Sequence, residues 1–153
     1  MKTLVLGLGN PILTDDGVGI HVVRQVAAAC DRPDVRFAEA AVGGLRLLEL
    51  IAGYDRLILV DAIQTPDGRP GQIYRLALGD LRSSRHAGST HDLSFPEAIA
   101  WGRRLGLALP AEDAISIIAV EAEDVLSFGE TLTSAVAASL PQARQMVLDL
   151  LAA

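Results

Sequence analysis

Short apolar runs, separated by glycine, proline and polar residues, recur along the chain and predict its strands. The runs at 2–9, 56–61 and 114–120 are apolar on successive positions, which is typical of strands buried on both faces of a parallel sheet. A weaker candidate lies at 35–41, and alternating residues at 72–78 predict one more strand. The pattern therefore indicates a sheet of about five strands.

Helical spacing fills the intervals between these runs. Apolar residues three or four positions apart predict helices at 18–30, 44–53, 95–105 and 133–151. Ser94 and Glu97 have the spacing of a capping box, with proline in the first turn, which supports the third of these starts. Strands alternate with helices, and neither an internal repeat nor a linker interrupts them. We therefore expect an α/β fold: a single three-layer α/β/α domain over residues 1–153 with a mostly parallel, twisted sheet.

The segment 79–92 is rich in serine, arginine, histidine and glycine and is predicted to be a long loop. Long ordered loops in compact domains usually carry function. This loop ends just before the helix predicted at 95–105.

Composition and charge remove several classes of protein. The chain of 153 residues has 13 basic and 19 acidic residues, with a formal net charge of −6 and no basic cluster, which argues against nucleic-acid binding. Every apolar run is far shorter than the ~20 residues of a membrane-spanning helix, so no membrane insertion is expected. Cys30 is the only cysteine, which excludes an internal disulfide and indicates a reducing, cytoplasmic compartment.

Two acidic features stand where the predicted topology places ligand sites, and a third polar feature lies at the end of the long loop. In a parallel α/β sheet, ligands bind outside the carboxyl ends of the strands. Asp15-Asp16 lies at the loop-to-helix junction after the first strand, Asp61 ends the central strand, and Thr90-His91-Asp92 closes the long loop. Carboxylates and an imidazole from three loops suit a divalent metal site with open positions for water or substrate.

Each of these residues also has a structural interpretation. Asp15 or Asp16 would suit the N-terminus of the following helix, where a carboxylate accepts backbone N–H bonds. Asp61 could hold a turn, and His91 could be a solvated or capping histidine. Glu39 follows the weak strand and could line the same edge. Spacing alone leaves these alternatives open.

The glycines after the first strand resemble only the beginning of a dinucleotide-binding fingerprint. Gly7 and Gly9 have the expected spacing, but Ile12 stands where the third glycine is required. The acidic pair Asp15-Asp16 at the helix start would also repel a pyrophosphate. Nucleotide binding is therefore a weak hypothesis.

Four segments, in order along nearly the whole chain, resemble the hydrogenase maturation endopeptidases. They are GLGNPILTDDGVGIHVV (Gly7 to Val23), GYDRLILVDA (Gly53 to Ala62), STHDL (Ser89 to Leu93) and AVEAEDVLSFGETLT (Ala119 to Thr133). The resemblance implies a three-layer α/β fold. It also implies an aspartic-type or metal-dependent endopeptidase that removes the C-terminal extension of a nickel–iron hydrogenase large-subunit precursor after nickel insertion.

The same resemblance implies roles for three residues. The family's metal-contacting acid falls on Asp16, its strand-end aspartate on Asp61 and its histidine on His91. The nickel would be carried by the precursor, with any cysteine ligands supplied by that substrate. Hydrolysis would use Asp16 or Asp61 as a general base toward water, or the metal as a Lewis acid. Glu39-Ala40-Ala41 departs from the family pattern of an acid followed by two glycines, so no role is implied for Glu39.

Two other functions compete with this interpretation. A non-catalytic nickel-binding assembly factor would use the same ligands but leave the precursor's tail intact. A peptidyl-tRNA hydrolase also carries a G-L-G-N-P element after its first strand. However, this chain has Ile12 to Asp16 where that family has a run containing histidine.

Overall fold

Residues 1–82 and 94–153 are described by the structure, which is a computed structural model. The segment 83–93, which includes the candidate ligand His91, lies outside the described residues.

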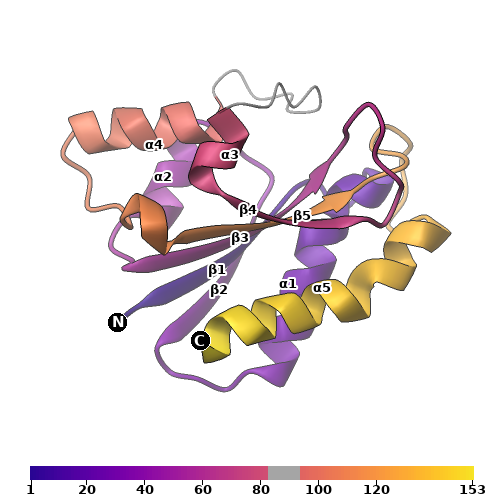
Figure 1. Cartoon of the computed structure of the whole chain (residues 1–153), viewed down its shortest axis with the longest axis horizontal. Coiled ribbons are helices and arrows are strands. Elements are labelled where there is room, and N and C mark those ends of the chain that lie inside the picture. The colour runs from indigo at the N-terminus through magenta and orange to yellow at the C-terminus, as the bar shows by residue number, and fades with distance from the viewer. Residues whose placement is uncertain (83–93) are drawn as a thin grey trace.

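A five-stranded sheet forms the middle layer, in the order β2-β1-β3-β5-β4 (Figure 1). The strands are β1 (Thr3–Leu8), β2 (Val35–Ala40), β3 (Arg56–Ile63), β4 (Ile73–Ala77) and β5 (Ile115–Glu121). The neighbours β2, β1, β3 and β5 pair in parallel, and β4 pairs antiparallel with β5 at one edge. The mostly parallel α/β sheet predicted from the apolar runs is confirmed.

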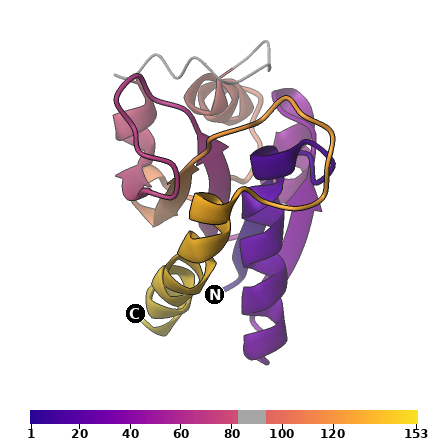
Figure 2. The same cartoon turned by 90° about the vertical axis from the view of Figure 1, so that its right-hand side faces the viewer.

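Helices cover both faces of this sheet. They are α1 (Val18–Ala29), α2 (Leu45–Ile51), α3 (Leu78–Arg82), α4 (Phe95–Arg104) and α5 (Ser134–Ala152), with short 3-10 turns η1 (Thr14–Gly17) and η2 (Glu112–Ala114). Figures 1 and 2 show α1 and α5 side by side on one face, with α2 and α4 on the other. Ser94 Oγ accepts the Glu97 amide at 3.3 Å, as the capping-box spacing predicts. Within the described part of the chain, no helix has the length and hydropathy needed to cross a bilayer.

The predicted loop at 79–92 is wrong at its start, because α3 begins at Leu78. Asp80 Oδ2 accepts the backbone amide of Ala77 at 2.7 Å, and Leu78 is fully buried. An acid in the first helical turn that binds the amide preceding the helix favours a helix start. The polar composition of the segment gave no sign of this local contact.

Side chains from alternate strand positions build two separate cores. Val5, Ile58, Val60 and Ile118 pack toward α1 and α5, whereas Leu4, Leu6, Leu57, Leu59 and Ile117 pack toward α2 and α4. Neighbouring strand residues point to opposite faces, so a continuous apolar run is required where both faces are covered. Full burial of each such side chain contributes about 1.5–3 kcal/mol to folding.

Glycines allow α1 to approach the sheet closely. A Cβ atom on Gly19 would lie 2.2 Å from the carbonyl oxygen of Val60 and 2.9 Å from that of Leu8. A Cβ atom on Gly7 would lie 2.6 Å from the carbonyl oxygen of Gly19. The glycines therefore permit direct backbone packing, which places the start of α1 against the carboxyl ends of β1 and β3.

Candidate active site at the carboxyl edge of the sheet

Asp61 lies inside β3, at the point where β3 passes its neighbour β1. The β1 pairing reaches only Gly7 opposite Val60, but β5 continues alongside β3 with Asp61 opposite Ala119. The prediction that Asp61 ends the strand is therefore wrong by two residues, because β5 extends the pairing to Ile63. Asp61 is the first residue of β3 with no β1 partner, and η1 lies in contact with β3.

The carboxyl group of Asp61 is held by its own backbone and is poorly solvated. The amide of Ala62 donates to Oδ1 at 2.8 Å. The pKa of Asp61 is raised to about 8, chiefly because burial disfavours the charged carboxylate; the Ala62 amide lowers this pKa, and the nearby negative charge of Asp16 adds a smaller increase. The group therefore titrates near neutral pH, and it lies within electrostatic range of Asp16.

Asp16 reaches this edge on η1, enclosed by the loop after β1. The Asn10 amide donates to Asp16 Oδ2 at 2.8 Å. Gly9 has a φ of 138°, and a Cβ atom there would lie 1.9 Å from the carbonyl oxygen of Asp16. The glycine is required both for its backbone conformation and for this close approach.

The two carboxylates share one arrangement. Each has one oxygen fixed by a backbone amide: Oδ2 of Asp16 by Asn10, and Oδ1 of Asp61 by Ala62. Asp16 Oδ1 and Asp61 Oδ2 have no hydrogen-bond partner among residues 1–82 and 94–153, and both residues are intermediate in solvent exposure. Two oriented carboxylates with an available oxygen each can bind a cation or activate a water molecule.

Asp15, next to Asp16 in sequence, has a different environment and a structural role. Its side chain is 0% exposed. Its oxygens accept the amides of Glu123 and Asp124 at 3.0 Å, the Thr133 amide at 2.8 Å and the Thr133 hydroxyl at 2.7 Å. The Asp15 carboxylate is therefore hydrogen-bonded to both ends of the loop between β5 and α5, at Glu123 and Asp124 and at Thr133. The alternative that Asp15 or Asp16 caps α1 is wrong, because Gly17 is the N-cap and no side chain bonds there.

Thr14 completes the contact between the two loops, and sequence reasoning did not identify it. Its amide donates to the carbonyl of Gly129 at 2.9 Å and its hydroxyl to that of Ser127 at 2.6 Å. Its φ of 51° is uncommon for a β-branched residue and marks local strain beside the site. The sequence signal was limited to the family-like stretch Ala119 to Thr133, which gave no individual roles.

Two other acidic residues near this edge already form hydrogen bonds or an ion pair with neighbouring residues. Glu39 lies within β2 and pairs with Arg24 through two hydrogen bonds of 2.8 and 2.9 Å, so the structure assigns it a surface ion pair. Glu121, 2% exposed, accepts the Thr65 amide at 2.8 Å and the Tyr74 hydroxyl at 2.9 Å. Glu121 thereby anchors the loop after β3, a role that its position at a strand end did not reveal.

The described residues do not by themselves complete a metal site. Residues 1–82 and 94–153 contain no group of three or more histidine, cysteine or acidic side chains that could hold an ion. The predicted third ligand, His91, lies outside the described residues. The structure thus brings Asp16 and Asp61 together, and the role of His91 stays a prediction.

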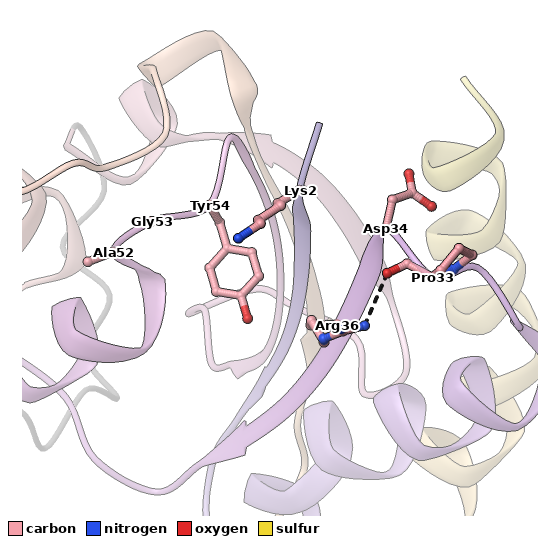
Figure 3. Close-up of a pocket in the computed structure, with 7 residues that line it drawn as sticks. All are labelled: Lys2, Pro33, Asp34, Arg36, Ala52, Gly53 and Tyr54. Atoms are coloured by element: carbon pink, nitrogen blue, oxygen red, sulfur yellow. Dashed lines mark hydrogen bonds between the residues drawn. The ribbon is translucent and has the colours of Figure 1, made fainter.

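A pocket of about 320 Å³ lies at the opposite edge of the sheet (Figure 3). Lys2, Arg36 and Tyr54 are among its lining residues, and each stands near the start of a strand. Its one carboxylate, Asp34, pairs with Arg32 at 2.6 Å. Because Asp16 and Asp61 lie at the carboxyl ends of the strands, this pocket is separate from the candidate active site.

Comparisons with a family model and with related proteins point to the same protein family. The family described as HycI, hydrogenase maturation protease, matches residues 20–150. The Hydrogenase 2 maturation protease of Escherichia coli K12 is 38% identical over 72 residues, which are 46% of this chain and 44% of that protein. The hydrogenase expression/formation protein HoxM of Azotobacter vinelandii is 29% identical over 97% of this chain and 72% of its own length.

Solved structures extend the similarity to the whole fold. The hydrogenase maturating endopeptidase HybD of E. coli has a TM-score of 0.83 and 28% identity, covering 99% of this chain and 92% of that one. The [NiFe] hydrogenase maturation protease HybD of Thermococcus kodakarensis has a TM-score of 0.67 and 26% identity, covering 98% and 99%. The chain therefore belongs to the hydrogenase maturation protease family, which places it among the peptidases, as its motifs indicated.

Proposed function

We propose that this chain is the endopeptidase that removes the C-terminal extension of a nickel–iron hydrogenase large-subunit precursor after nickel insertion. The observation that carries the proposal is the meeting of Asp16 and Asp61 at one edge of the sheet in a member of this protease family. The two residues come from distant segments and each keeps one available oxygen. The lone cysteine favours the cytoplasm as the place of the reaction.

In this proposal the nickel belongs to the precursor and is part of the substrate. Asp16 and Asp61 offer hard oxygen ligands, and His91 offers a borderline nitrogen. Since Cys30 is the only cysteine of the chain, thiolate ligands would come from the precursor. The ion would thus report that the precursor is loaded and would position its tail at the two carboxylates.

Two routes to hydrolysis fit this arrangement. In the first, one aspartate takes a proton from the attacking water and later returns it to the leaving amide nitrogen. In the second, the nickel of the substrate polarises the scissile carbonyl, and the aspartates orient the ion and the water. Both require an aspartate oxygen without a protein partner, and Asp16 Oδ1 and Asp61 Oδ2 have none among the residues that the structure describes.

The test uses the purified chain, the nickel-loaded precursor of a hydrogenase from the same source, and mass spectrometry of the product. Asp16→Asn, Asp61→Asn and His91→Ala are each expected to slow tail removal by at least about 100-fold, as for loss of a general base or metal contact. Asp67→Asn is the matched control, because Asp67 is an exposed carboxylate on the loop after β3.

Three results would contradict the proposal in different ways. If all three variants process the precursor at the wild-type rate, the site assignment is wrong. If the wild-type chain leaves the tail of loaded precursor intact, an assembly factor becomes the better description. If precursor without nickel is cleaved at the same rate as loaded precursor, recognition of the nickel is refuted.

A further inference from the structure

Two large apolar side chains stand almost fully in solvent on the loop between β5 and α5. Leu126 is 84% exposed and Phe128 is 85% exposed. Ile12, on the loop that this segment contacts, is 47% exposed. We call these three residues the apolar rim. Scattered single apolar residues are common on surfaces, but an exposed aromatic with apolar neighbours is a usual feature of a protein contact.

The backbone beneath Leu126 and Phe128 is tightly held. Asp124 Oδ1 accepts the amides of Leu126 and Ser127 at 3.0 and 2.9 Å. Asp15 in turn holds the amide of Asp124. A side chain presented on such a fixed backbone loses little additional freedom on binding, which favours its use as an anchor.

The same contacts place the apolar rim beside the candidate active site. The Gly129 amide donates to the carbonyl of Ile12 at 2.9 Å, and Thr14 bonds to the residues on either side of Phe128. Thr14 is two positions before Asp16. Figure 2 shows the loop between β5 and α5, in orange, lying over η1 and the start of α1, in indigo. The rim and the carboxylate are therefore parts of one continuous edge.

Acidic residues near the apolar rim indicate which charge a partner surface should carry. Glu123 and Glu130 are exposed on the same loop. An apolar anchor flanked by carboxylates complements an apolar recess bordered by lysine or arginine side chains. The chain as a whole is acidic, with a net charge of −6, so attraction to a basic surface would also be long-range.

We propose that Ile12, Leu126 and Phe128 dock the folded body of the precursor protein, so that its C-terminal tail reaches Asp16 and Asp61. The proposal rests on the function proposed above, because it takes the precursor as the partner. It assigns the rim to substrate binding and gives it no part in bond cleavage. Loss of the rim should therefore raise KM and leave kcat unchanged.

The experiment compares the wild-type chain with the double variant Leu126→Ser/Phe128→Ser. Its readouts are the steady-state kinetics of tail removal and the Kd for purified nickel-loaded precursor. Loss of two anchors is expected to raise both KM and Kd at least tenfold, with kcat within twofold of wild type. Leu105→Ser is the control, since Leu105 is 64% exposed in the connection from α4 to β5, and no change is expected there. Thermal unfolding should be unaffected in both variants, because these side chains are exposed.

The outcomes separate this inference from the proposed function. An unchanged KM and Kd in the double variant would overturn the docking surface even if the wild-type chain removes the tail. A weakened Kd without any tail removal by the wild-type chain would support docking and refute the peptidase proposal. A tenfold loss in the Leu105→Ser control as well would show that any exposed apolar residue contributes, which would also refute a specific rim.

Discussion

Asp15 and Asp16 are adjacent in sequence, but their side chains have different environments, so substitutions at the two positions should have different effects. Asp15 is buried and accepts four hydrogen bonds that fasten the loop between β5 and α5. Asp16 is partly exposed, accepts one backbone hydrogen bond and faces the candidate active site. We predict that substitutions at Asp15 chiefly lower stability, whereas substitutions at Asp16 chiefly lower activity.

The expected magnitudes follow from the contacts. Asp15→Ala leaves the amides of Glu123, Asp124 and Thr133 without their acceptor. An unsatisfied buried donor costs about 1–3 kcal/mol, and relaxation of the loop toward water lowers the sum, so we expect a loss of about 3–5 kcal/mol. This is a large part of the ~5–15 kcal/mol that stabilises a typical domain.

Conservative variants sharpen the contrast. In Asp15→Asn the amide oxygen can keep the three bonds made by Oδ2, but the NH2 group then faces the Thr133 amide, for an expected cost of about 1–3 kcal/mol. Asp16→Asn alters a single hydrogen bond, from Asn10, and removes a charge close to Asp61. We expect its stability to stay within about 1 kcal/mol of wild type.

Urea unfolding followed by circular dichroism measures these differences at a common m-value. For a chain of this size, 3–5 kcal/mol corresponds to a fall in Tm of about 10 °C or more. The reasoning is refuted if the free energy of unfolding of Asp15→Ala lies within about 0.5 kcal/mol of wild type, as for an ordinary surface substitution. It is equally refuted if Asp16→Asn is as unstable as Asp15→Ala.

Three further predictions concern Asp61, the glycine contact and Glu121. The folded-state pKa of Asp61, about 8, lies above the ordinary value of 3.8 for an aspartate. Wild type should therefore lose stability relative to Asp61→Asn as pH rises from about 4 to 8, by at most about 1.4 kcal/mol per pH unit. A difference in Tm between the two proteins that stays flat over this range would contradict the raised pKa. Gly19→Ala places a Cβ atom 2.2 Å from the Val60 carbonyl oxygen and should lower the free energy of unfolding, measured in urea, by several kcal/mol, on the order of an overpacked core. Gly79→Ala is the control: its Cβ would lie 3.8 Å from Glu112 Oε1, so its effect on stability should be neutral or slightly favourable. Glu121→Gln should raise the hydrogen-exchange rate of the Thr65 amide roughly tenfold, because one charge-assisted bond of about 1.5 kcal/mol is weakened, and an unchanged rate would remove Glu121 as the anchor of that loop.

Local pattern determined much of the fold from the sequence alone. The run at 56–61 is apolar on successive residues, and such a run is stable only between two covering layers, so a central parallel strand followed. The spacing of Ser94 and Glu97 located the start of α4, because the capping contact spans only three residues. Asp61 and Asp16 were predicted near one edge since both follow strands of the same parallel sheet.

Tertiary structure gave the neighbouring acids different environments, which local pattern does not distinguish. Asp15 and Asp16 are equivalent in local sequence, and the difference arises because Asp15 meets residues 108–118 positions away. The extension of β3 beyond Asp61 depends on pairing with β5, which no local pattern contains. Leu126 and Phe128 are apolar in sequence, and only the tertiary structure shows that both stand in solvent on a loop that is hydrogen-bonded to Thr14. Propensity and periodicity act over a few residues, whereas burial and hydrogen bonding in the site are set by segments brought together only when the chain is folded.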